Sequence, residues 1–510
     1  MPQFSLALIL TALLTSFLGL RYFLRRARLS YPPGPKPLPL IGNLFDLPKS
    51  FSWLTYASWA KTYGDVVSIV VVGQRIVILT SATAARELFE KPIYSDRPTI
   101  PIFDTGLMNW NWMTQLTSYG DQLQAQRRVL HGGMRPSALA QHRPMFEAKV
   151  HQFLSRLAET PHDFVEHLER SSKLQGSILM SLAYGYEVKP NNDKLFSIVQ
   201  ETGRLAVTVM LPGTQLVNDL PALQYLPEWF PGTGFWKLAR KGRELGKAMA
   251  DSPIAFVKES MAKGTAQPSI ARDGFEVMQE SDYVLKPGSI TEEALRNACG
   301  SLYLAGFDTV VAALHSLFLA LALHPLVQRK AQAEVDAVTG RTRLPSFDDQ
   351  PHLPYVDAIC KELVRWRPLA PMLFPHKVHE DNTYRGYLIP KGTIVMVNGW
   401  QARFPAILQD PERFPDPDSF KPERFLTDEQ SRKSDEEVVN GAAFGFGRRH
   451  CPGRNVTDAI LFMTVASLLA SFDVGPQKNE HGEEIPLTGA YTGNSASRPE
   501  PFECSITPRD

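Results

Sequence analysis

The sequence predicts a mainly α-helical protein with a smaller β-rich part, preceded by a membrane-spanning helix at the N-terminus. Three features support this prediction: an apolar run near the N-terminus, an apolar helical stretch of more than thirty residues, and only a few β-branched runs in a chain that is otherwise mostly helix-compatible. Of the 510 residues, 44% are hydrophobic, which is enough for a large core. No long Gly/Ser linker or low-complexity block divides the chain, so we expect one large domain behind the anchor.

Residues Phe4 to Leu24 form the almost uninterrupted apolar run. At about 1.5 Å per residue this run would span roughly 31 Å as a helix, which is enough to cross the apolar core of a bilayer. Arg25, Arg26 and Arg28 follow it, and no Lys or Arg precedes it, so the positive-inside rule places the rest of the chain in the cytosol. A cleaved signal peptide would carry its charge before the run and a small-residue cleavage site after it, which favours a retained anchor over residues 1–29.

A proline-rich segment follows the predicted anchor. Residues 30–44 contain the sequence Pro32-Pro33-Gly34-Pro35-Lys36-Pro37-Leu38-Pro39. Proline fixes φ and removes a backbone donor, so we expect a stiff, non-helical hinge between the anchor and the domain formed by residues 45–510. By composition alone, the segment is equally compatible with a proline-rich recognition peptide.

Two segments predict the main elements of the domain. Val66 to Val72 and Arg75 to Thr80 are β-branched runs around Gly73-Gln74, which predicts a hairpin. Ser289-Ile-Thr-Glu292 has the pattern of a capping box, and the apolar stretch that follows it continues to His324-Pro325. A helix of that length has to cross the interior of the domain.

Shorter elements follow the long helix. Leu353 to Arg367 is predicted as a helix that ends before Pro368, and Tyr387 to Asn398 as strand with a turn at Pro390-Lys391-Gly392. From Asp410 to Phe425 the many prolines and the lack of periodicity predict irregular chain.

Charge and cysteine usage exclude several functions. The net charge of +1 argues against nucleic acid as a partner. The four cysteines, Cys299, Cys360, Cys451 and Cys504, are far apart and form no Cys-x-x-Cys pair, so neither a zinc site nor a disulfide framework is expected. Cysteine usage of this kind fits a reducing compartment that faces the cytosol.

One of these cysteines lies in a segment with the features of a metal site, Phe444-Gly-Phe-Gly447-Arg-Arg449-His-Cys451-Pro-Gly453, directly before an apolar, helix-compatible stretch. A thiolate at a helix N-terminus is stabilised by free backbone N–H groups and by the helix dipole, so it can bind a metal ion. Gly447 and Gly453 would let the backbone pass close to a flat ligand. Arg449 would pair with a carboxylate, and Phe444 would place an apolar ring beside the sulfur. A flat, metal-containing dicarboxylate is haem.

The segment resembles the haem-binding signature of the cytochromes P450, Phe-x-x-Gly-x-Arg-x-Cys-x-Gly, at every fixed position. This resemblance implies the mainly α cytochrome P450 fold, a haem b cofactor, and ligation of the haem iron by the Cys451 thiolate, which favours O–O cleavage. The alternative is a buried structural cysteine in a glycine-rich turn, and it requires the whole pattern to have arisen by chance.

A second segment lies midway along the predicted long helix. Ala305-Gly306-Phe307-Asp308-Thr309 combines two small residues, which let a ligand approach the helix, with an acid and a hydroxyl that can hold a water and relay protons. It resembles the oxygen-activation motif of the cytochromes P450, small-Gly-x-acid-Thr. The resemblance implies that Thr309 and Asp308 are catalytic, with Asp308 as the source of protons. The alternative is an apolar helix with incidental polar residues.

Glu362-Leu-Val-Arg365 places an acid and a base three residues apart on one helix face, where an ion pair forms readily. Such pairs are usually surface salt bridges worth under ~1 kcal/mol. Here the spacing resembles the Glu-x-x-Arg motif of the cytochromes P450, which joins an arginine of a downstream Pro-Glu-Arg-Phe, present as Pro422 to Phe425. The resemblance implies a buried structural network of Glu362, Arg365 and Arg424.

Two further residues are predicted to bind haem propionates. Pro375-His376 follows the Glu-x-x-Arg helix at the spacing where cytochromes P450 place an Arg or His on a propionate. Arg127 ends a segment that resembles the family's Trp-x-x-x-Arg motif, although Leu123 replaces the Trp, and Tyr119-Gly120-Asp121 supports the alignment. The alternative for His376 is an incidental histidine.

An aromatic loop before residue 121 corresponds to the region that covers the haem in cytochromes P450, and the resemblance implies that it contacts substrate. Apolar clusters of this kind are equally often core. Tyr491 to Ser497 is predicted to add a second wall. The predicted substrate contacts are Phe103, Trp110, Trp112 and Met113, with Ala305 on the long helix.

The resemblance implies a haem-thiolate monooxygenase that activates O2 and hydroxylates or epoxidises a lipophilic small molecule. The chain has no Gly-x-Gly-x-x-Gly unit of a nucleotide-binding domain, so electrons have to come from another protein. NADPH–cytochrome P450 reductase is the expected donor, with cytochrome b5 as a second candidate. The resemblance also implies a single-pass protein of the endoplasmic reticulum membrane, in contact with membrane lipid, with a cytosolic catalytic domain.

Three segments resemble cytochromes P450 of fungal secondary metabolism: Tyr384–Pro390, the cysteine loop and the tail Pro501–Ile506. A terpenoid, polyketide or indole-type intermediate is therefore the expected substrate. Two alternatives keep the haem-thiolate fold. One is an isomerase or dehydratase acting on a peroxide or an oxime, although such enzymes usually lack the acid–Thr pair. The other is a haem-binding sensor or carrier without turnover.

Overall fold

A computed structural model describes residues 30–509, except for residues 49, 105, 170–171, 190–191, 211–214, 281–282, 284–285, 400–406 and 494–496. The predicted membrane anchor, residues 1–29, lies outside the described residues. Among the helices that the structure describes, one is long and apolar enough to cross a membrane, and 75% of its apolar window is buried inside the protein. That degree of burial is typical of a core helix.

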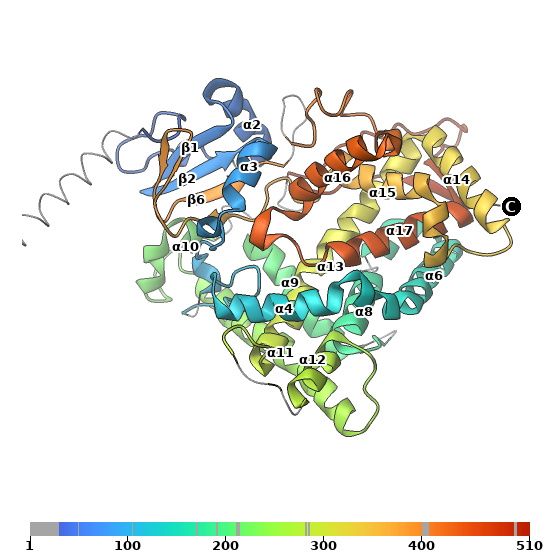
Figure 1. Ribbon diagram of the computed structural model, residues 1–510, viewed down its shortest axis with the longest axis horizontal. Helices are drawn as coiled ribbons and strands as arrows, with labels where there is room; N and C mark the ends of the chain where they lie inside the picture. Colours follow the sequence, from blue (N-terminus) through green and yellow to red (C-terminus); the bar gives the residue numbers. More distant parts are fainter. Residues whose placement is uncertain are drawn as a thin grey trace, which may run out of the picture.

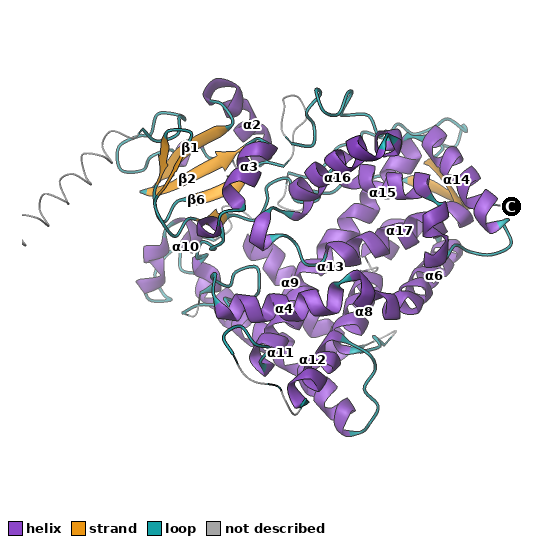
Figure 2. Cartoon of the chain, in the orientation of Figure 1, coloured by secondary structure: helices purple, strands orange, loops and turns teal. Residues whose placement is uncertain are grey.

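The molecule consists of a large helical part with a small sheet at one side (Figure 1, upper left; Figure 2). The helices are α2 (Ser52–Tyr63), α3 (Ala82–Phe89), α4 (Asp121–Met134), α5 (Pro136–Leu139), α6 (Arg143–Glu159), α7 (Phe164–Glu169), α8 (Ser172–Tyr184), α9 (Lys194–Met210), α10 (Leu216–Asp219), α11 (Phe235–Ala262), α12 (Ile270–Gln279), α13 (Glu292–Leu323), α14 (Pro325–Thr339), α15 (Pro354–Trp366), α16 (Glu429–Phe444) and α17 (Arg454–Ser471). The strands are β1 (Val66–Val71), β2 (Gln74–Leu79), β3 (His376–Lys377), β4 (Asn382–Tyr384), β5 (Tyr387–Ile389), β6 (Ile394–Val397), β7 (Phe472–Pro476) and β8 (Cys504–Pro508). The mainly α prediction with a smaller β part is confirmed.

The main sheet joins segments that are far apart in the sequence. Its strand order is β1-β2-β6-β3, with β1 and β2 antiparallel and β2 parallel to β6. The predicted hairpin is confirmed, but its turn is Val72-Gly73, one residue earlier than expected. Both turn residues have positive φ (46° and 81°), as a two-residue type I′ turn requires. The predicted strand 387–398 is two strands in different sheets, because β5 pairs with β4 while β6 joins the main sheet.

α13 runs through the core and confirms the predicted long helix. Its N-cap is Thr291, whose hydroxyl accepts the N–H of Ala294 at 3.1 Å. The predicted capping box beginning at Ser289 is wrong: the Ser289 hydroxyl instead accepts the N–H of Lys286 at 2.9 Å. Thr291 has the extended backbone of an N-cap (φ −114°, ψ 162°). Both residues carry side chains able to cap, and the acid three residues after Ser289 pointed to the wrong one.

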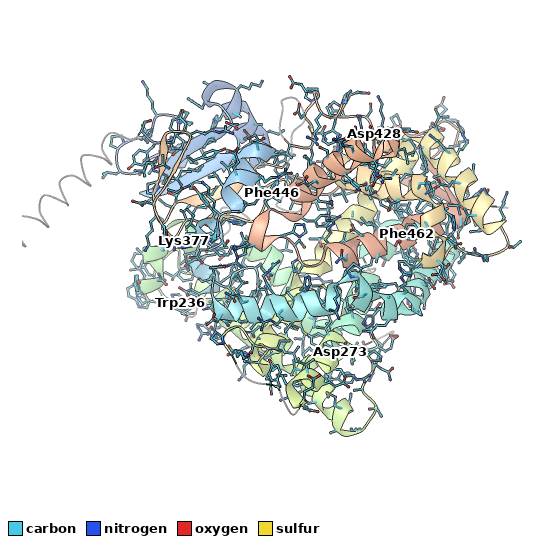
Figure 3. All side chains as sticks on the ribbon, viewed as in Figure 1. Trp236, Asp273, Lys377, Asp428, Phe446 and Phe462 are labelled. Carbon is cyan, nitrogen blue, oxygen red and sulfur yellow. The ribbon has the colours of Figure 1, made fainter. Side chains whose placement is uncertain are left out.

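The largest hydrophobic core surrounds α13 and includes residues of α6, α8, α15 and α17. Phe318 of α13 and Phe462 of α17 are fully buried in it (Phe462 is labelled in Figure 3). α17 begins directly after the cysteine loop, so the packing of α17 against α13 fixes the loop relative to the long helix.

The proline-rich segment lies against the sheet. Ser68 N–H donates to the Pro33 carbonyl at 2.8 Å and Asn43 N–H to the Val70 carbonyl at 2.6 Å. A Cβ at Gly34 would overlap the Ser68 carbonyl, so the backbones touch there. Residues 30–43 contain no helix, and hydrogen bonds attach the segment to β1.

A buried ion network joins α15 to the irregular segment that precedes α16. The Glu362 carboxylate accepts two hydrogen bonds from Arg365, at 2.6 and 2.8 Å, and one from Arg424 at 3.4 Å. The side chains of Glu362 and Arg365 are completely buried. Arg365 also donates to the Pro417 carbonyl at 2.9 Å. Charge-assisted hydrogen bonds, and not regular secondary structure, therefore hold the proline-rich segment from residue 410 onward against α15.

Candidate active site

The cysteine loop lies between the end of α16 and the start of α17. Cys451 N–H donates to the Phe444 carbonyl at 2.7 Å, and His450 N–H to the Gly447 carbonyl at 3.1 Å. Gly453 is the N-cap of α17. The loop thus folds back on itself and presents the sulfur at the N-terminus of a long buried helix, as the sequence predicts for a metal-binding thiolate.

The thiol of Cys451 is subject to opposing effects. Burial raises its pKa, while hydrogen bonds from the Gly453 and Arg454 backbone N–H groups and the positive charge of Arg127 lower it. Burial is the largest of these effects, so the pKa lies above the ordinary value for cysteine. The helix N-terminus therefore acts in the predicted direction, but a bound metal ion is needed to make the thiolate the stable form.

α13 presents one face that is not packed against protein. Ala305 is exposed and Thr309 half-buried, one turn apart, although most of the helix is buried. The Thr309 hydroxyl donates to the Ala305 carbonyl at 3.2 Å. Gly306 does not lie on that face: a Cβ there would approach the Leu179 side chain of α8 to 2.8 Å, so its small size serves helix packing. The side chain of Asp308 lies outside what the structure describes.

Arg449 is buried and donates to three backbone carbonyls. Its Nε donates to Ser95 at 2.7 Å, and its two Nη atoms donate to Thr114 at 3.2 Å and Thr117 at 2.6 Å. A charged guanidinium thus ties the cysteine loop to the segment before α4. These contacts leave two of its five N–H groups for the predicted carboxylate partner.

Other cationic and imidazole groups lie near Arg449. Arg127 donates to the His450 carbonyl at 2.9 Å, and His376 Nδ1–H donates to the Tyr94 carbonyl at 2.6 Å. Arg97, which the sequence analysis missed, donates to the carbonyls of Phe374 and Pro375 at 2.9 and 2.6 Å. Arg97 belongs to no recognisable sequence motif, and no spacing in the sequence links it to the cysteine loop. Its position near Arg449 is therefore seen only in the folded structure.

The electrostatics of this cluster favour the binding of an anion. Burial and the charges of Arg449 and Arg127 lower the pKa of Arg97 well below its usual value. Burial and the charge of Arg127 lower the pKa of Arg449 to about 10. Among the described residues, Asp96 is the acid whose charge opposes this effect on both groups. The buried Arg97 Nε has no hydrogen-bond partner in the described part of the chain. A ligand carrying carboxylates would offset the repulsion between these cations.

The remaining loop residues have defined places. The Phe444 ring lies tilted against His450, with 6.4 Å between ring centroids. Gly447 has φ +61°, and a Cβ there would overlap the Phe89 carbonyl, so this glycine lets the loop pass close to the end of α3. A Cβ at Gly453 would lie 3.8 Å from the Cys451 sulfur, in ordinary contact. The predicted haem contacts of these three residues stay predictions.

The predicted substrate residues are mostly buried within the protein. Phe103, Trp110 and Met113 are no more than 3% exposed and belong to one hydrophobic cluster, against which Trp112 packs. Tyr491 is also buried, and its hydroxyl donates to Ser316 Oγ at 3.1 Å. Residues 494–496 of the predicted second wall lie outside the described residues.

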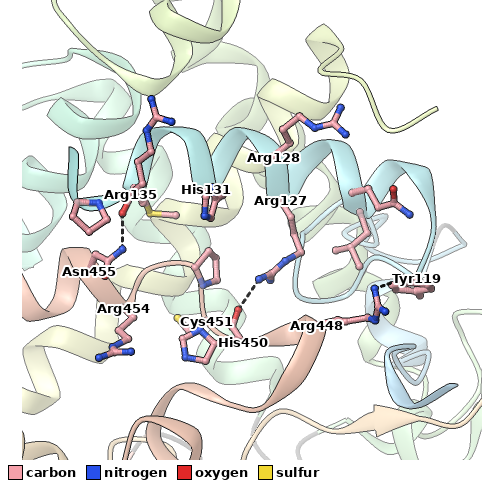
Figure 4. A pocket seen from close by; sticks show the side chains of 15 residues that line it. Tyr119, Arg127, Arg128, His131, Arg135, Arg448, His450, Cys451, Arg454 and Asn455 are labelled. Carbon is pink, nitrogen blue, oxygen red and sulfur yellow. Dashed lines mark hydrogen bonds between the residues drawn. The ribbon is translucent and has the colours of Figure 1, made fainter. Parts of the chain in front are cut away.

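A pocket of about 710 Å³ opens beside the cysteine loop, between α4 and the start of α17 (Figure 4). In Figure 4, Arg127 points from α4 towards the His450 carbonyl, and Cys451 is labelled next to His450. The described residues that line this pocket include no acid; its cations are Arg127, Arg128, Arg135, Arg448 and Arg454. The surface of the protein at this pocket is therefore strongly basic.

These residues fit a planar metal-containing dicarboxylate. One thiol at a helix N-terminus can ligate the metal, three arginines with too few acids can bind carboxylates, and Ala305 and Thr309 give α13 a face that is free to contact a flat group. Comparison with known proteins decides the family. Residues 32–503 match the family model "Cytochrome P450". The chain belongs to the cytochrome P450 family.

Relatives of this chain include cytochrome P450 monooxygenases of fungi. It is 39% identical over 503 residues to the cytochrome P450 monooxygenase claR of Ampulloclitocybe clavipes, covering 98% of this chain and 89% of that protein. It is 39% identical over 482 residues to the cytochrome P450 monooxygenase COX2 of Coprinopsis cinerea, covering 94% and 89%. The chain is therefore a cytochrome P450 monooxygenase acting on small molecules. The family implies a haem cofactor, a redox partner and a lipophilic substrate.

Proposed function

We propose that this cytochrome P450 uses O2 and electrons from NADPH–cytochrome P450 reductase to hydroxylate or epoxidise a lipophilic intermediate of fungal secondary metabolism, of terpenoid, polyketide or indole type. The observation that carries the proposal is the cysteine loop, in which Cys451 lies at the N-terminus of α17 beside an arginine cluster that has too few acids. The substrate class rests on the resemblance of Tyr384–Pro390, the cysteine loop and the tail Pro501–Ile506 to cytochromes P450 of fungal secondary metabolism, and the two relatives named above are fungal monooxygenases.

Each site residue has a distinct role in this proposal. Haem, when bound, supplies redox chemistry at an iron ligated by the Cys451 sulfur. Arg97, Arg127 and Arg449 hold its propionates, and each is already fixed by bonds to backbone carbonyls. The Thr309 hydroxyl, which donates to the Ala305 carbonyl of its own helix, is the proton-donating group on the open face of α13. Asp308 supplies protons to this hydroxyl.

The basic pocket supports a negatively charged electron donor. Arg128, Arg135 and Arg448 are exposed around it; α4 carries Arg128, Arg135 caps its C-terminus, and Arg448 belongs to the cysteine loop. An acidic face of the reductase would be attracted to this surface and oriented on it, at a short distance from the sulfur. The same surface is compatible with cytochrome b5 as a second electron donor.

Exposed apolar side chains support attachment to a membrane. Leu40 and Phe45 in the N-terminal segment are 95% and 80% exposed, and Tyr225 and Trp229, after α10, are 83% and 80% exposed. Large apolar side chains at this exposure are typical of a surface that contacts lipid or protein. In Figure 1 α10 lies on the side of the molecule where the sheet and the N-terminal segment are found. With the predicted anchor over residues 1–29, followed by a segment that is attached to β1, this supports a single-pass protein of the endoplasmic reticulum with its domain in the cytosol.

The carbon-monoxide difference spectrum of the reduced membrane fraction tests the proposal. Wild type should give the red-shifted Soret band of thiolate-ligated haem, and Cys451→Ala should lose it while the protein is still made. Wild-type protein without that band would show that the cysteine loop does not ligate iron, and the proposed mechanism would be abandoned. With the band present, NADPH and reductase are added to candidate terpenoid, polyketide and indole substrates, and turnover of a member of one class defines the substrate.

A further inference from the structure

The loop formed by residues 107–117 rests on α11 at two glycines. Gly242 and Gly246 lie one helical turn apart on α11. A Cβ at Gly242 would overlap the Met108 side chain, and a Cβ at Gly246 would overlap the Trp110 indole. Both loop side chains are buried. The two glycines therefore form a seat into which the loop inserts one thioether and one aromatic ring.

Hydrogen bonds hold the loop in this seat. The Trp110 indole N–H donates to the Gly242 carbonyl at 2.7 Å inside the protein. Arg243, between the two glycines, donates through Nε to the Leu107 carbonyl at 2.9 Å. Asn109 has φ +58°, a left-handed conformation that asparagine tolerates, and it turns the chain just before Trp110. The indole ring of Trp110, its N–H group and the guanidinium of Arg243 thus all attach the start of the loop to α11.

The other half of the loop rests on α13. A Cβ at Gly300 would lie 3.0 Å from the Trp112 ring, and Thr114 N–H donates to the Ser301 hydroxyl at 2.8 Å. The Thr114 carbonyl in turn accepts a bond from Arg449 of the cysteine loop. The loop therefore connects α11 to the long helix and to the candidate haem site.

We propose that Trp110 is a positioning residue: by locking residues 107–117 into the Gly242–Gly246 seat, it makes the loop and α11 one mechanical unit that holds Trp112 against Gly300 of α13, the helix whose open face carries Thr309. This inference rests on the proposed function for its consequence, the shape of the substrate pocket. The lock itself rests on the contacts alone. The indole N–H of Trp110 donates to α11, and the predicted contact of Trp110 with substrate stays a prediction.

Hydrogen–deuterium exchange on the full-length holoenzyme tests the lock. Gly246→Ala places a methyl group where the indole lies, and Trp110→Phe removes the N–H and keeps an apolar ring. Each should speed amide exchange in residues 107–117 by about five- to tenfold, as expected for loss of one buried hydrogen bond or of close packing. The rate at which imidazole binds the ferric iron should rise in the same variants, because the loop opens more often.

Gly234→Ala is the matched control, because it starts the same helix and a Cβ there has no heavy atom within 4 Å. Exchange in residues 107–117 that stays at the level of the control in both variants would overturn the proposal. Trp110→Phe keeps the test decisive if Gly246→Ala does not fold. Wild-type protein without the thiolate band would refute the proposed function, whereas the exchange measurement judges the lock independently of it.

Discussion

Replacing Glu362 with Gln removes the one carboxylate of the buried network while keeping the shape of the side chain. Its Oε2 accepts from Arg365 at 2.6 Å, and its Oε1 accepts from Arg365 at 2.8 Å, from Lys421 N–H at 2.8 Å and from Arg424 at 3.4 Å. In glutamine one of these oxygens becomes an amide NH2 that faces the donors of a guanidinium. Two arginine charges then lack their carboxylate, one of them completely buried.

Breaking a buried ion pair from one side costs about 3–5 kcal/mol, because the remaining charge stays buried without a partner. Proteins are stable by only about 5–15 kcal/mol, so Glu362→Gln should lower the denaturant midpoint substantially or prevent accumulation of folded enzyme. Urea unfolding followed by tryptophan fluorescence measures the loss. Glu429→Gln is the control: it removes a carboxylate of the same kind from an exposed i,i+4 pair with Lys433, which should cost about 0.5 kcal/mol or less.

A loss below about 1 kcal/mol for Glu362→Gln, or a loss equal to that of Glu429→Gln, would refute the reasoning. It would mean that water or a rearranged backbone carbonyl compensates the arginine charges. The network would then be a consequence of the fold rather than a cause of its stability.

Three further changes test the site and its surfaces. Arg97→Gln removes one of three cations from the candidate propionate site, so transfer of haem to apomyoglobin should be about tenfold faster or more; an unchanged rate would remove Arg97 from the site. Arg135→Glu should raise the KM for reductase several-fold at low ionic strength and much less at high salt, whereas Lys237→Glu on α11 should leave it unchanged. Replacing both Tyr225 and Trp229 with Ser should reduce flotation of an anchor-deleted protein (lacking residues 1–29) with phospholipid vesicles, and equal flotation would assign these residues to another contact.

Sequence periodicity predicted the long elements because their length leaves few alternatives. α13 and the β1–β2 hairpin occur within one or two residues of the expected positions. The N-cap was misplaced because Ser289 and Thr291 have equivalent side chains, and only the backbone conformation separates them. The partition of residues 387–398 between two sheets depends on pairing with β2, far away in the sequence, which no local pattern encodes.

The residues of the candidate site that lie within one short motif were predicted from the sequence. The residue that only the fold brings to the site was missed. Cys451 and Arg449 lie within one segment, so their proximity follows from the sequence. Arg97 joins them only because the loop before α4 packs against the segment that carries Phe374, and a single arginine before a proline gives no such signal. Long-range contacts of this kind require the structure.

Glycine explains why the substrate side was harder to predict than the metal side. From sequence, a glycine near a cofactor motif suggests room for a ligand. In this protein the space beside Gly306 and Gly447 is filled by the Leu179 side chain and by the Phe89 carbonyl, and the space beside Gly246 by the Trp110 indole. Each glycine sets how closely two segments approach. The residue that a glycine accommodates is therefore a better guide to how two segments pack than the glycine itself, as the Trp110 indole against Gly246 illustrates.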